Sequence, residues 1–143
     1  MNAPAIPPGF TPNPRKSPLT DPWEPMYWKQ TENAIVIGLR LDTPHTNARG
    51  LIHGGLIAAL ADKAMGHSCG YKLGSAFSLV TVNLSVDYIG SAKIGQWLAV
   101  ESEVLKSGRT ICFVQSIITA DDEPIARANA TFRVVPRSQH APT

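Results

Sequence analysis

The spacing of hydrophobic residues predicts a β-strand over residues 34–41. Ile35, Ile37 and Leu39 recur at every second position, the period at which side chains fall on one face of an extended chain. Four later segments, each rich in Val, Ile, Leu or Thr and separated by short turns, also predict strands. They cover residues 77–89, 97–106, 110–120 and 125–135.

One long helix is predicted between the first strand and the other four. Helix-forming residues follow Gly54-Gly55 and cover residues 56–72, with Leu56, Leu60 and Ala64 on one face. A strand, a helix and four strands joined by short turns favour an α+β domain. In such a domain an antiparallel sheet carries the helix on one face.

The N-terminal segment differs in composition from the rest of the chain. Eight of the 12 prolines lie in residues 1–25, where they remove backbone donors and block helix formation. We therefore expect an extended or a partly disordered arm that packs little on its own, and we expect Trp23, Tyr27 and Trp28 at its end to dock on the core or on a neighbouring subunit. The expected division is an arm (1–28), one domain (29–136) and a tail (137–143).

Composition excludes several functional classes. The net charge of +2 arises from 13 basic and 11 acidic residues scattered along the chain, without the basic patch of a nucleic-acid reader. No hydrophobic stretch approaches the roughly 20 residues that span a bilayer, and no secretory signal is evident, so a cytoplasmic protein is expected. Cys69 and Cys112 are isolated and predict buried hydrophobic positions, with neither a disulfide nor a metal site.

Polar residues that could support chemistry gather in the segment 47–55 and at Asp62 within the predicted helix. A buried carboxylate among hydrophobic residues is costly and indicates a function, but an exposed Asp62 that pairs with Lys63 or with solvent fits the pattern equally well. Gly54-Gly55 would leave free N–H groups that stabilise negative charge on a carbonyl oxygen. Taken alone, the glycines are more typical of a tight turn, and His53 and Asn47 are more typical of structural roles.

A resemblance to a known family changes this balance. The spacing Asn47-x5-His53-Gly54-Gly55-x6-Asp62 resembles the signature of the hotdog-fold thioesterases of the phenylacetate-pathway (PaaI-like) and Them2-like group. Segments 81–89, 92–95 and 104–110 resemble further motifs of that group in the same order. The similarity extends over residues 34–135 and implies an antiparallel sheet of about five strands wrapped around one long central helix.

The resemblance also implies an activity and a set of site residues. The protein would be an acyl-CoA thioesterase that needs no metal and no cofactor other than the coenzyme A of its substrate. Asp62 would act as general base or nucleophile, the Gly54 N–H would polarise the thioester carbonyl, Asn47 and His53 would support that end of the site, and Thr81 would position water. The implied coenzyme A contacts are Tyr88, Ile89, Gly90, Ser91, Ala92, Lys93, Ser107, Gly108, Arg109, Thr110 and Arg133.

The family implies a homodimer that pairs into a dimer of dimers, and helix geometry supports a two-chain site. Gly54 and Asp62 are eight residues apart, or roughly 12 Å along a helix. One thioester carbon cannot meet both groups, whereas an antiparallel second copy would bring its Asp62 to the first copy's Gly54. Two alternatives stay open: a hydratase or dehydratase of the same fold, and a non-catalytic acyl-CoA binding module. The acyl group and the choice between base and nucleophile are also left open.

Overall fold

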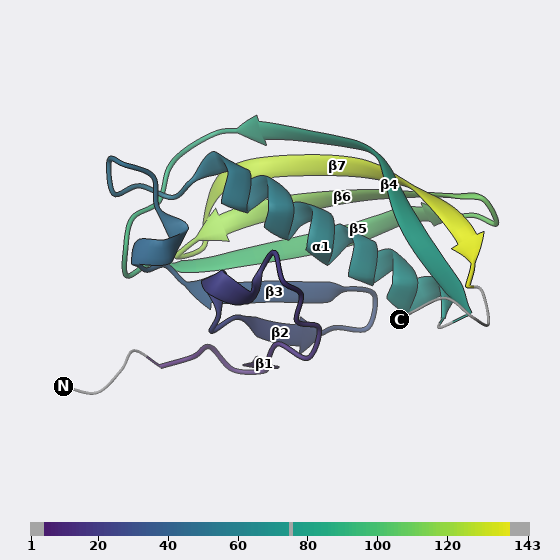
Figure 1. The fold of residues 1–143 in the computed structure, drawn as a ribbon, viewed down its shortest axis with the longest axis horizontal. Coiled ribbons are helices and arrows are strands. Elements are labelled where there is room, and N and C mark those ends of the chain that lie inside the picture. The colour runs from purple at the N-terminus through teal and green to yellow at the C-terminus, as the bar shows by residue number, and fades with distance from the viewer. Residues whose placement is uncertain (1–4, 75, 138–143) are drawn as a thin grey trace.

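A computed structural model describes residues 5–74 and 76–137 of the chain, which form one sheet and one long helix (Figure 1). The sheet has seven strands in the order β1-β2-β3-β5-β6-β7-β4, and all neighbouring pairs are antiparallel. The strands are β1 (Thr11–Pro12), β2 (Tyr27–Gln30), β3 (Ile35–Arg40), β4 (Phe77–Tyr88), β5 (Trp97–Ser107), β6 (Ile111–Ala120) and β7 (Glu123–Pro136). The predicted α+β class and all five predicted strands are confirmed.

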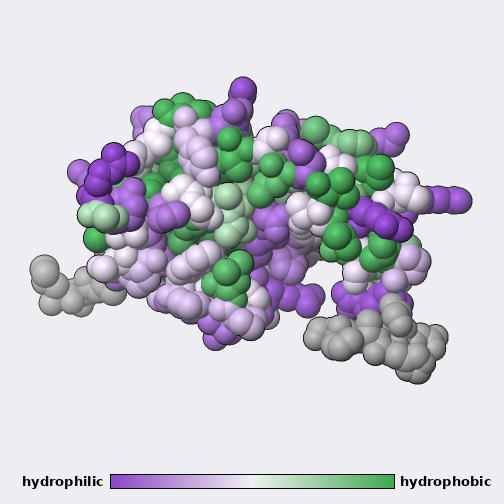
Figure 2. Space-filling model, turned by 45° about the horizontal axis from the view of Figure 1, so that its top comes forward, coloured by the Kyte–Doolittle hydropathy of each residue, from purple (hydrophilic) through white to green (hydrophobic). Residues whose placement is uncertain are grey.

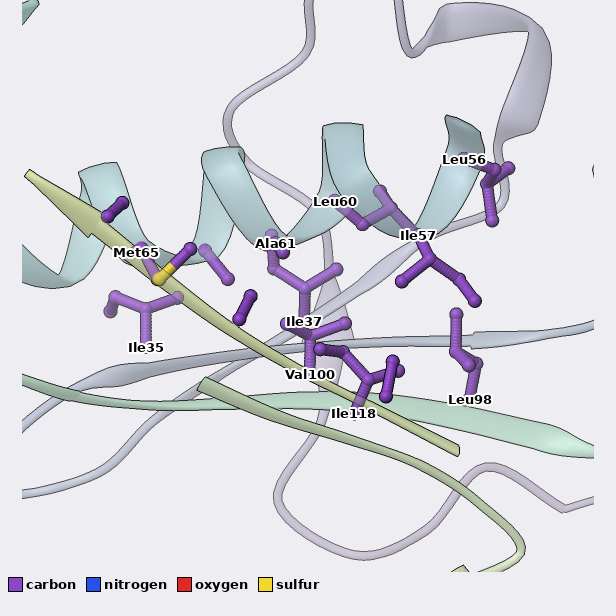
Figure 3. Packing of buried hydrophobic residues seen from close by; sticks show 14 of the residues in the cluster. Ile35, Ile37, Leu56, Ile57, Leu60, Ala61, Met65, Leu98, Val100 and Ile118 are labelled. Carbon is purple, nitrogen blue, oxygen red and sulfur yellow. The ribbon is translucent and has the colours of Figure 1, made fainter. Parts of the chain in front are cut away.

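The helix α1 (Gly54–Leu73) lies across one face of the sheet. Its inner side carries Leu56, Leu60 and Met65, which are almost fully buried against hydrophobic side chains of the strands (Figure 3). Burying these side chains is the main stabilising contribution, because removing hydrophobic surface from water is favourable. The helix begins two residues earlier than predicted, because His53 accepts a hydrogen bond at its N-terminus.

The prediction of about five strands is wrong by two, and both missed strands come from the proline-rich arm. β1 pairs with β2, and β2 pairs with β3 along its whole length. Asn13 and Thr20 are 4% and 3% exposed, so the expectation that the arm packs little is also wrong. The expected domain boundary at residue 28 falls inside β2, whose pairing with β3 joins the arm to the domain.

The aromatic end of the arm docks on the core, as predicted. Tyr27 packs against Trp97 of β5, and Trp28 packs edge-on against His67 of α1 with ring centroids 5.2 Å apart. Phe10 also contacts Trp97, on the side of the sheet away from α1. The arm therefore wraps around the β1–β2 edge and contacts both layers of the domain. Of the predicted tail, residues 138–143 lie outside the described part of the chain.

Both cysteines are buried, as predicted from their isolated positions in the sequence. Cys69 on α1 and Cys112 on β6 are both fully buried and both free. Burial raises the pKa of the Cys69 thiol well above its usual range, which keeps it protonated. Within the described residues, no helix is long and hydrophobic enough to cross a membrane. The cytoplasmic location stays a prediction.

Candidate active site

The first turn of α1 offers one free backbone donor. His53 is the residue before the helix, and its Nδ1 accepts a hydrogen bond from the Gly55 N–H at 2.8 Å. The expectation that both glycine N–H groups are free is therefore wrong for Gly55. The Gly54 N–H has no acceptor among the described residues. It lies at the positive end of the helix dipole, where a partial negative charge is stabilised.

Tyr88 explains why a glycine stands at position 54. Its hydroxyl donates to the Gly54 carbonyl oxygen at 2.6 Å, and its ring would lie 3.3 Å from a Cβ placed on Gly54. A larger residue would have to push this ring away. Sequence reasoning assigned Tyr88 to coenzyme A binding and missed this contact, which is formed by residues 34 positions apart.

The loop before the helix is held by its own side chains. The Asn47 side-chain oxygen accepts hydrogen bonds from the Arg49 and Leu51 N–H groups, which closes the loop over residues 47–51. His45 is buried: its Nδ1 accepts from the Asp42 N–H, and its Nε2 donates to a carbonyl of the arm. Its own carbonyl accepts from the His53 N–H at 3.0 Å. Sequence reasoning missed His45, although its spacing from Asp42 matches a helix-capping pattern.

Asp62 lies near the middle of α1, on its outer side, and is half-buried. The Thr81 hydroxyl, on the edge strand β4, donates to Asp62 Oδ1 at 2.7 Å. The alternative of an Asp62 paired with Lys63 is not found, because the Lys63 ammonium donates to the Arg15 carbonyl of the arm instead. Asp62 thus keeps a carboxylate with one oxygen fixed by a hydroxyl and the other without a protein donor among the described residues.

A hollow of about 320 Å³ lies in front of this carboxylate. Asp62 and Thr81 form part of its wall, with Phe132 of β7 and His67 of α1 nearby. A second hollow of about 230 Å³ lies at the other end, beside His53 and Gly55 at the helix N-terminus. The Asp62 carboxylate and the N-terminal end of α1 therefore each border an accessible space of their own.

His67 gives the neighbourhood of Asp62 a measurable pH signature. Burial, followed by the positive charges of Lys63 and Arg15, lowers the pKa of His67 from 6.5 to about 4. Because the pKa of His67 is lower in the folded chain than in the unfolded chain, the unfolded chain takes up the proton first as the pH falls. The neutral His67 ring therefore contributes fully to stability above pH 6.5, and this contribution is lost as the pH falls through 4.

Between pH 6.5 and pH 4, we expect the free energy of unfolding of the wild type to fall by roughly 1–3 kcal/mol more than that of His67→Gln. Urea unfolding of both proteins at a series of pH values measures the difference. Parallel curves over that pH range would show that His67 does not control acid stability.

One chain does not bring Asp62 and Gly54 together. The two residues lie on the same helix, roughly 12 Å apart along its axis. The contacts of β4 show the same separation, because Thr81 near the middle of the strand contacts Asp62, whereas Tyr88 at its C-terminal end contacts Gly54. The Asp62 carboxylate and the Gly54 N–H are thus held at two separate places by the same pair of elements.

The expected coenzyme A contacts also form two groups at opposite ends of the sheet. Residues 88–93 lie at the N-terminal end of α1, where the Ala92 carbonyl accepts from the Ile52 N–H and the Ala92 side chain is 3% exposed. Residues 107–110 form the turn between β5 and β6 at the far end, and Arg133 lies beside Ile111 near that turn. Gly108 is required there, since a Cβ would lie 2.9 Å from the Ile111 carbonyl oxygen.

Comparison with known proteins places these observations in a family. A family model described as the thioesterase superfamily matches residues 49–126. The Pseudomonas aeruginosa protein PA0474, named as a candidate esterase, is 34% identical over 130 residues, which cover 90% of this chain and 97% of that protein. The human acyl-coenzyme A thioesterase 13 is 31% identical over 87 residues, or 59% of this chain and 60% of that protein.

A solved structure agrees with these relatives. Zebrafish thioesterase superfamily member 2 superposes with a TM-score of 0.67 at 27% identity, over 76% of this chain and 80% of that chain. The arm and β2 precede the segment that the family model matches. The chain therefore belongs to the thioesterase superfamily, and its antiparallel sheet around one long helix is the hotdog fold.

Proposed function

We propose that the protein hydrolyses acyl-CoA thioesters, with Asp62 as the catalytic carboxylate. The observation that carries this proposal is the Asp62–Thr81 hydrogen bond beside an accessible hollow. Thr81 fixes one carboxylate oxygen and leaves the other free to take a proton from water or to attack a carbonyl. Family membership and the name of the human relative support coenzyme A as the thiol part of the substrate.

The reaction needs a polarised carbonyl as well as a base. In the proposed site, the Gly54 N–H donates to the thioester oxygen while water, deprotonated by Asp62, forms the new C–O bond. The negative charge that develops on the carbonyl oxygen is held by this N–H and the helix dipole. Cleavage of the C–S bond then releases coenzyme A, whose sulfur receives the proton from Asp62, and a free acid. Direct attack by Asp62 would instead form an anhydride that water hydrolyses in a second step.

Because Gly54 and Asp62 of one chain are too far apart, we propose that each site combines Gly54 of one chain with Asp62 of a second. A two-fold axis that places two copies of α1 antiparallel would do this twice. β4 supports this arrangement, since it is an edge strand with no partner on its outer side among the described residues. It exposes Val80 and Val82, at 53% and 64%, and Ile89 directly after it is 61% exposed. Hydrophobic side chains are visible among polar ones on the side of the molecule that carries this edge (Figure 2).

The same two-fold axis would reconcile the two groups of coenzyme A contacts. An antiparallel partner brings its 107–110 turn toward the end of the sheet where residues 88–93 of the first chain lie. A coenzyme A molecule would then meet Lys93 of one chain and Arg109 of the other, whose positive charges complement its phosphates. Lys93 and Arg109 are both exposed.

Substitution Arg109→Ala is expected to raise KM for an acyl-CoA roughly three- to tenfold with little change in kcat, because it removes a charge that contacts only the nucleotide. Steady-state rates at low and high salt measure the effect, which should shrink as salt screens the phosphates. The control substrate is a short thioester of the same acid without the nucleotide. An equal change in KM for that substrate would remove Arg109 from coenzyme A binding.

Substitution Thr81→Val keeps the strand shape and removes the hydroxyl that donates to Asp62. We expect kcat to fall roughly tenfold to a hundredfold, since one of several positioning interactions is lost. Thr81→Ser is the matched variant and should keep most of the rate. Full activity in Thr81→Val would reduce Thr81 to a strand residue.

The function itself is tested by incubating the protein with aliphatic and aryl acyl-CoAs and detecting free thiol. Release of coenzyme A together with the free acid is the expected result. A changed double bond with an intact thioester would instead identify a hydratase or dehydratase, and binding without turnover would identify a binding module.

A further inference from the structure

A cavity of about 640 Å³ lies between the N-terminal arm and the second half of α1. The arm contributes Arg15 and Trp28 to its wall, and α1 contributes His67 and Tyr71. Trp28 packs edge-on against His67 with ring centroids 5.2 Å apart, so the two rings form one continuous part of the wall. We call this space the arm cavity. None of these four residues takes part in the proposed hydrolysis.

The arm cavity continues into the hollow beside Asp62. Both spaces are lined by His67, Gly70 and Arg137, so they adjoin along the outer side of α1. We call the combined space the groove. Asp62 lies at one end of it, and Gly70 lies about two turns further along the helix, roughly 12 Å away. A chain that starts beside the Asp62 carboxylate can therefore run along α1 into the arm cavity.

The floor of the groove is open because α1 carries glycines there. Asp62, Gly66 and Gly70 recur at every fourth position and so lie on one side of the helix. A Cβ on Gly66 would lie 3.5 Å from the Phe132 ring. In the described part of the chain, a Cβ on Gly70 would have no neighbouring heavy atom within 4 Å. The passage from Asp62 is thus bounded by Phe132 and opens at Gly70.

The proposed two-chain site leaves the groove accessible. When two copies of α1 are antiparallel, Gly54 of the partner subunit lies beside Asp62, and the partner's helix begins there. The half of α1 that follows Asp62 therefore extends past the partner's helix (Figure 1). The acyl part of a thioester can then enter the groove of the chain that supplies Asp62.

The far end of the groove is positively charged. Arg15 and Arg137 line the arm cavity, and none of its described lining residues is acidic. Neither arginine has an ion-pair partner within residues 5–74 and 76–137. Positive charge also reaches His67, whose pKa is lowered first by burial and then by Lys63 and Arg15. A carboxylate is the complementary group, since a guanidinium binds it through two parallel hydrogen bonds.

Backbone contacts hold both arginines at this end. The Arg15 N–H donates to Asn13 Oδ1 at 3.0 Å, and the Arg15 carbonyl accepts from the Lys63 ammonium of α1. The Arg137 N–H, directly after β7, donates to the Ala76 carbonyl at 2.9 Å. Segments from the two ends of the chain are therefore fixed beside the same half of the helix.

We propose that the groove binds the acyl part of the substrate and that Arg15 and Arg137 bind a second carboxylate at the end of that chain. The preferred substrates are then coenzyme A thioesters of long dicarboxylic acids. This inference rests on the proposed function, because it names the acyl group of the same hydrolysis. The distal carboxylate would lie roughly 12 Å from Asp62. That distance exceeds the Debye length at physiological salt, so the repulsion between the two carboxylates is largely screened.

The first test compares thioesters that differ only at the far end of the acyl chain. Sebacyl-CoA ends in a carboxylate, and decanoyl-CoA, of the same length, ends in a methyl group. We expect kcat/KM of the wild type to be about tenfold higher for sebacyl-CoA, because only this substrate pairs with the two arginines. Succinyl-CoA is too short to reach the arm cavity and should have no such advantage over butyryl-CoA.

Substitutions Arg15→Gln and Arg137→Gln should each lower the ratio of kcat/KM for sebacyl-CoA to that for decanoyl-CoA roughly threefold. The ratio cancels effects on folding and on coenzyme A binding, because both substrates share them. Lys16→Gln is the matched control: it removes the same charge one residue away, and Lys16 does not line the groove. Its ratio should equal that of the wild type. A wild-type ratio near one, or a ratio that survives both arginine substitutions, would overturn the proposal.

Substitution Gly70→Leu tests whether the acyl chain lies along α1. The leucine enters open space, and it favours a helix more than glycine does, so the circular dichroism spectrum should show an intact helix. We expect the ratio of kcat/KM for decanoyl-CoA to that for acetyl-CoA to fall at least about tenfold. Gly70→Ala adds only the Cβ and should change this ratio little. An unchanged ratio in Gly70→Leu would place the acyl chain elsewhere and overturn the proposal.

Thioether analogues of sebacyl-CoA and decanoyl-CoA, which cannot be hydrolysed, separate this proposal from the proposed function. By calorimetry, the carboxyl-ended analogue should bind about tenfold more tightly than the methyl-ended one, and Arg15→Gln should remove much of the difference. This preference without turnover of any acyl-CoA would overturn the proposed hydrolysis and support the groove with its two arginines. Turnover with equal binding of the two analogues would keep the hydrolysis and overturn the groove assignment.

Discussion

Replacement of Asp62 by Asn is expected to lower kcat at least about 100-fold while the protein remains folded, because the amide can neither accept a proton from water nor attack a carbonyl. The substitution keeps the side-chain volume. Asn also keeps an oxygen that can accept the hydrogen bond from the Thr81 hydroxyl. A loss of activity therefore reports on the charge and the basicity of the group rather than on its shape.

Initial rates with a saturating acyl-CoA, measured beside the urea unfolding curve of the same preparation, test this prediction. Asp122→Asn is a suitable control: Asp122 lies in the exposed β6–β7 turn at a φ of 69°, a conformation that Asn tolerates well. It should have the wild-type rate. Near-normal turnover by Asp62→Asn would remove this carboxylate from the mechanism.

Replacement of Gly54 by Pro is expected to lower kcat about 100-fold or more, because it removes the one free N–H at the start of α1. The backbone accommodates proline here. The first turn of a helix tolerates it, and the preceding His53 already has the extended conformation that a following proline requires, with φ −77° and ψ 129°. The circular dichroism spectrum should therefore show an intact helix.

Gly54→Ala separates loss of the donor from added bulk. It places a Cβ 3.3 Å from the Tyr88 ring, as proline does, but it keeps the N–H. We expect Gly54→Ala to retain much more activity than Gly54→Pro. Equal loss in the two variants would assign the effect to the Tyr88 contact and would leave the role of the N–H unsupported.

Local patterns were sufficient to predict most of the fold. The helix and the first predicted strand each carry a hydrophobic period, and the other four strands are rich in Val, Ile, Leu or Thr. All six elements are confirmed within a few residues. β1 and β2 were missed because they are two and four residues long and adjoin prolines. Their structure depends on pairing with β3, which no local pattern contains.

The site could be predicted less completely than the fold. The family resemblance named Asp62, Gly54 and Thr81, but the hydrogen bond between Thr81 and Asp62 joins residues 19 positions apart and depends on where β4 crosses α1. The hydrogen bond from the Gly55 N–H to the His53 ring depends on a side-chain rotamer, which the spacing does not contain either. Spacing on one helix did predict correctly that Gly54 and Asp62 lie apart in a single chain.

The most direct test of the two-chain site is complementation between Asp62→Asn and Gly54→Pro. Each homodimer should be folded and inactive. Co-expression should make about half of the dimers mixed, and each mixed dimer has one site with both Gly54 and Asp62 intact, so roughly a quarter of the wild-type activity should return by the two-fold symmetry. If confirmed mixed dimers recovered no activity, each chain would have to build its own site, and the assignment of Gly54 or Asp62 would be wrong.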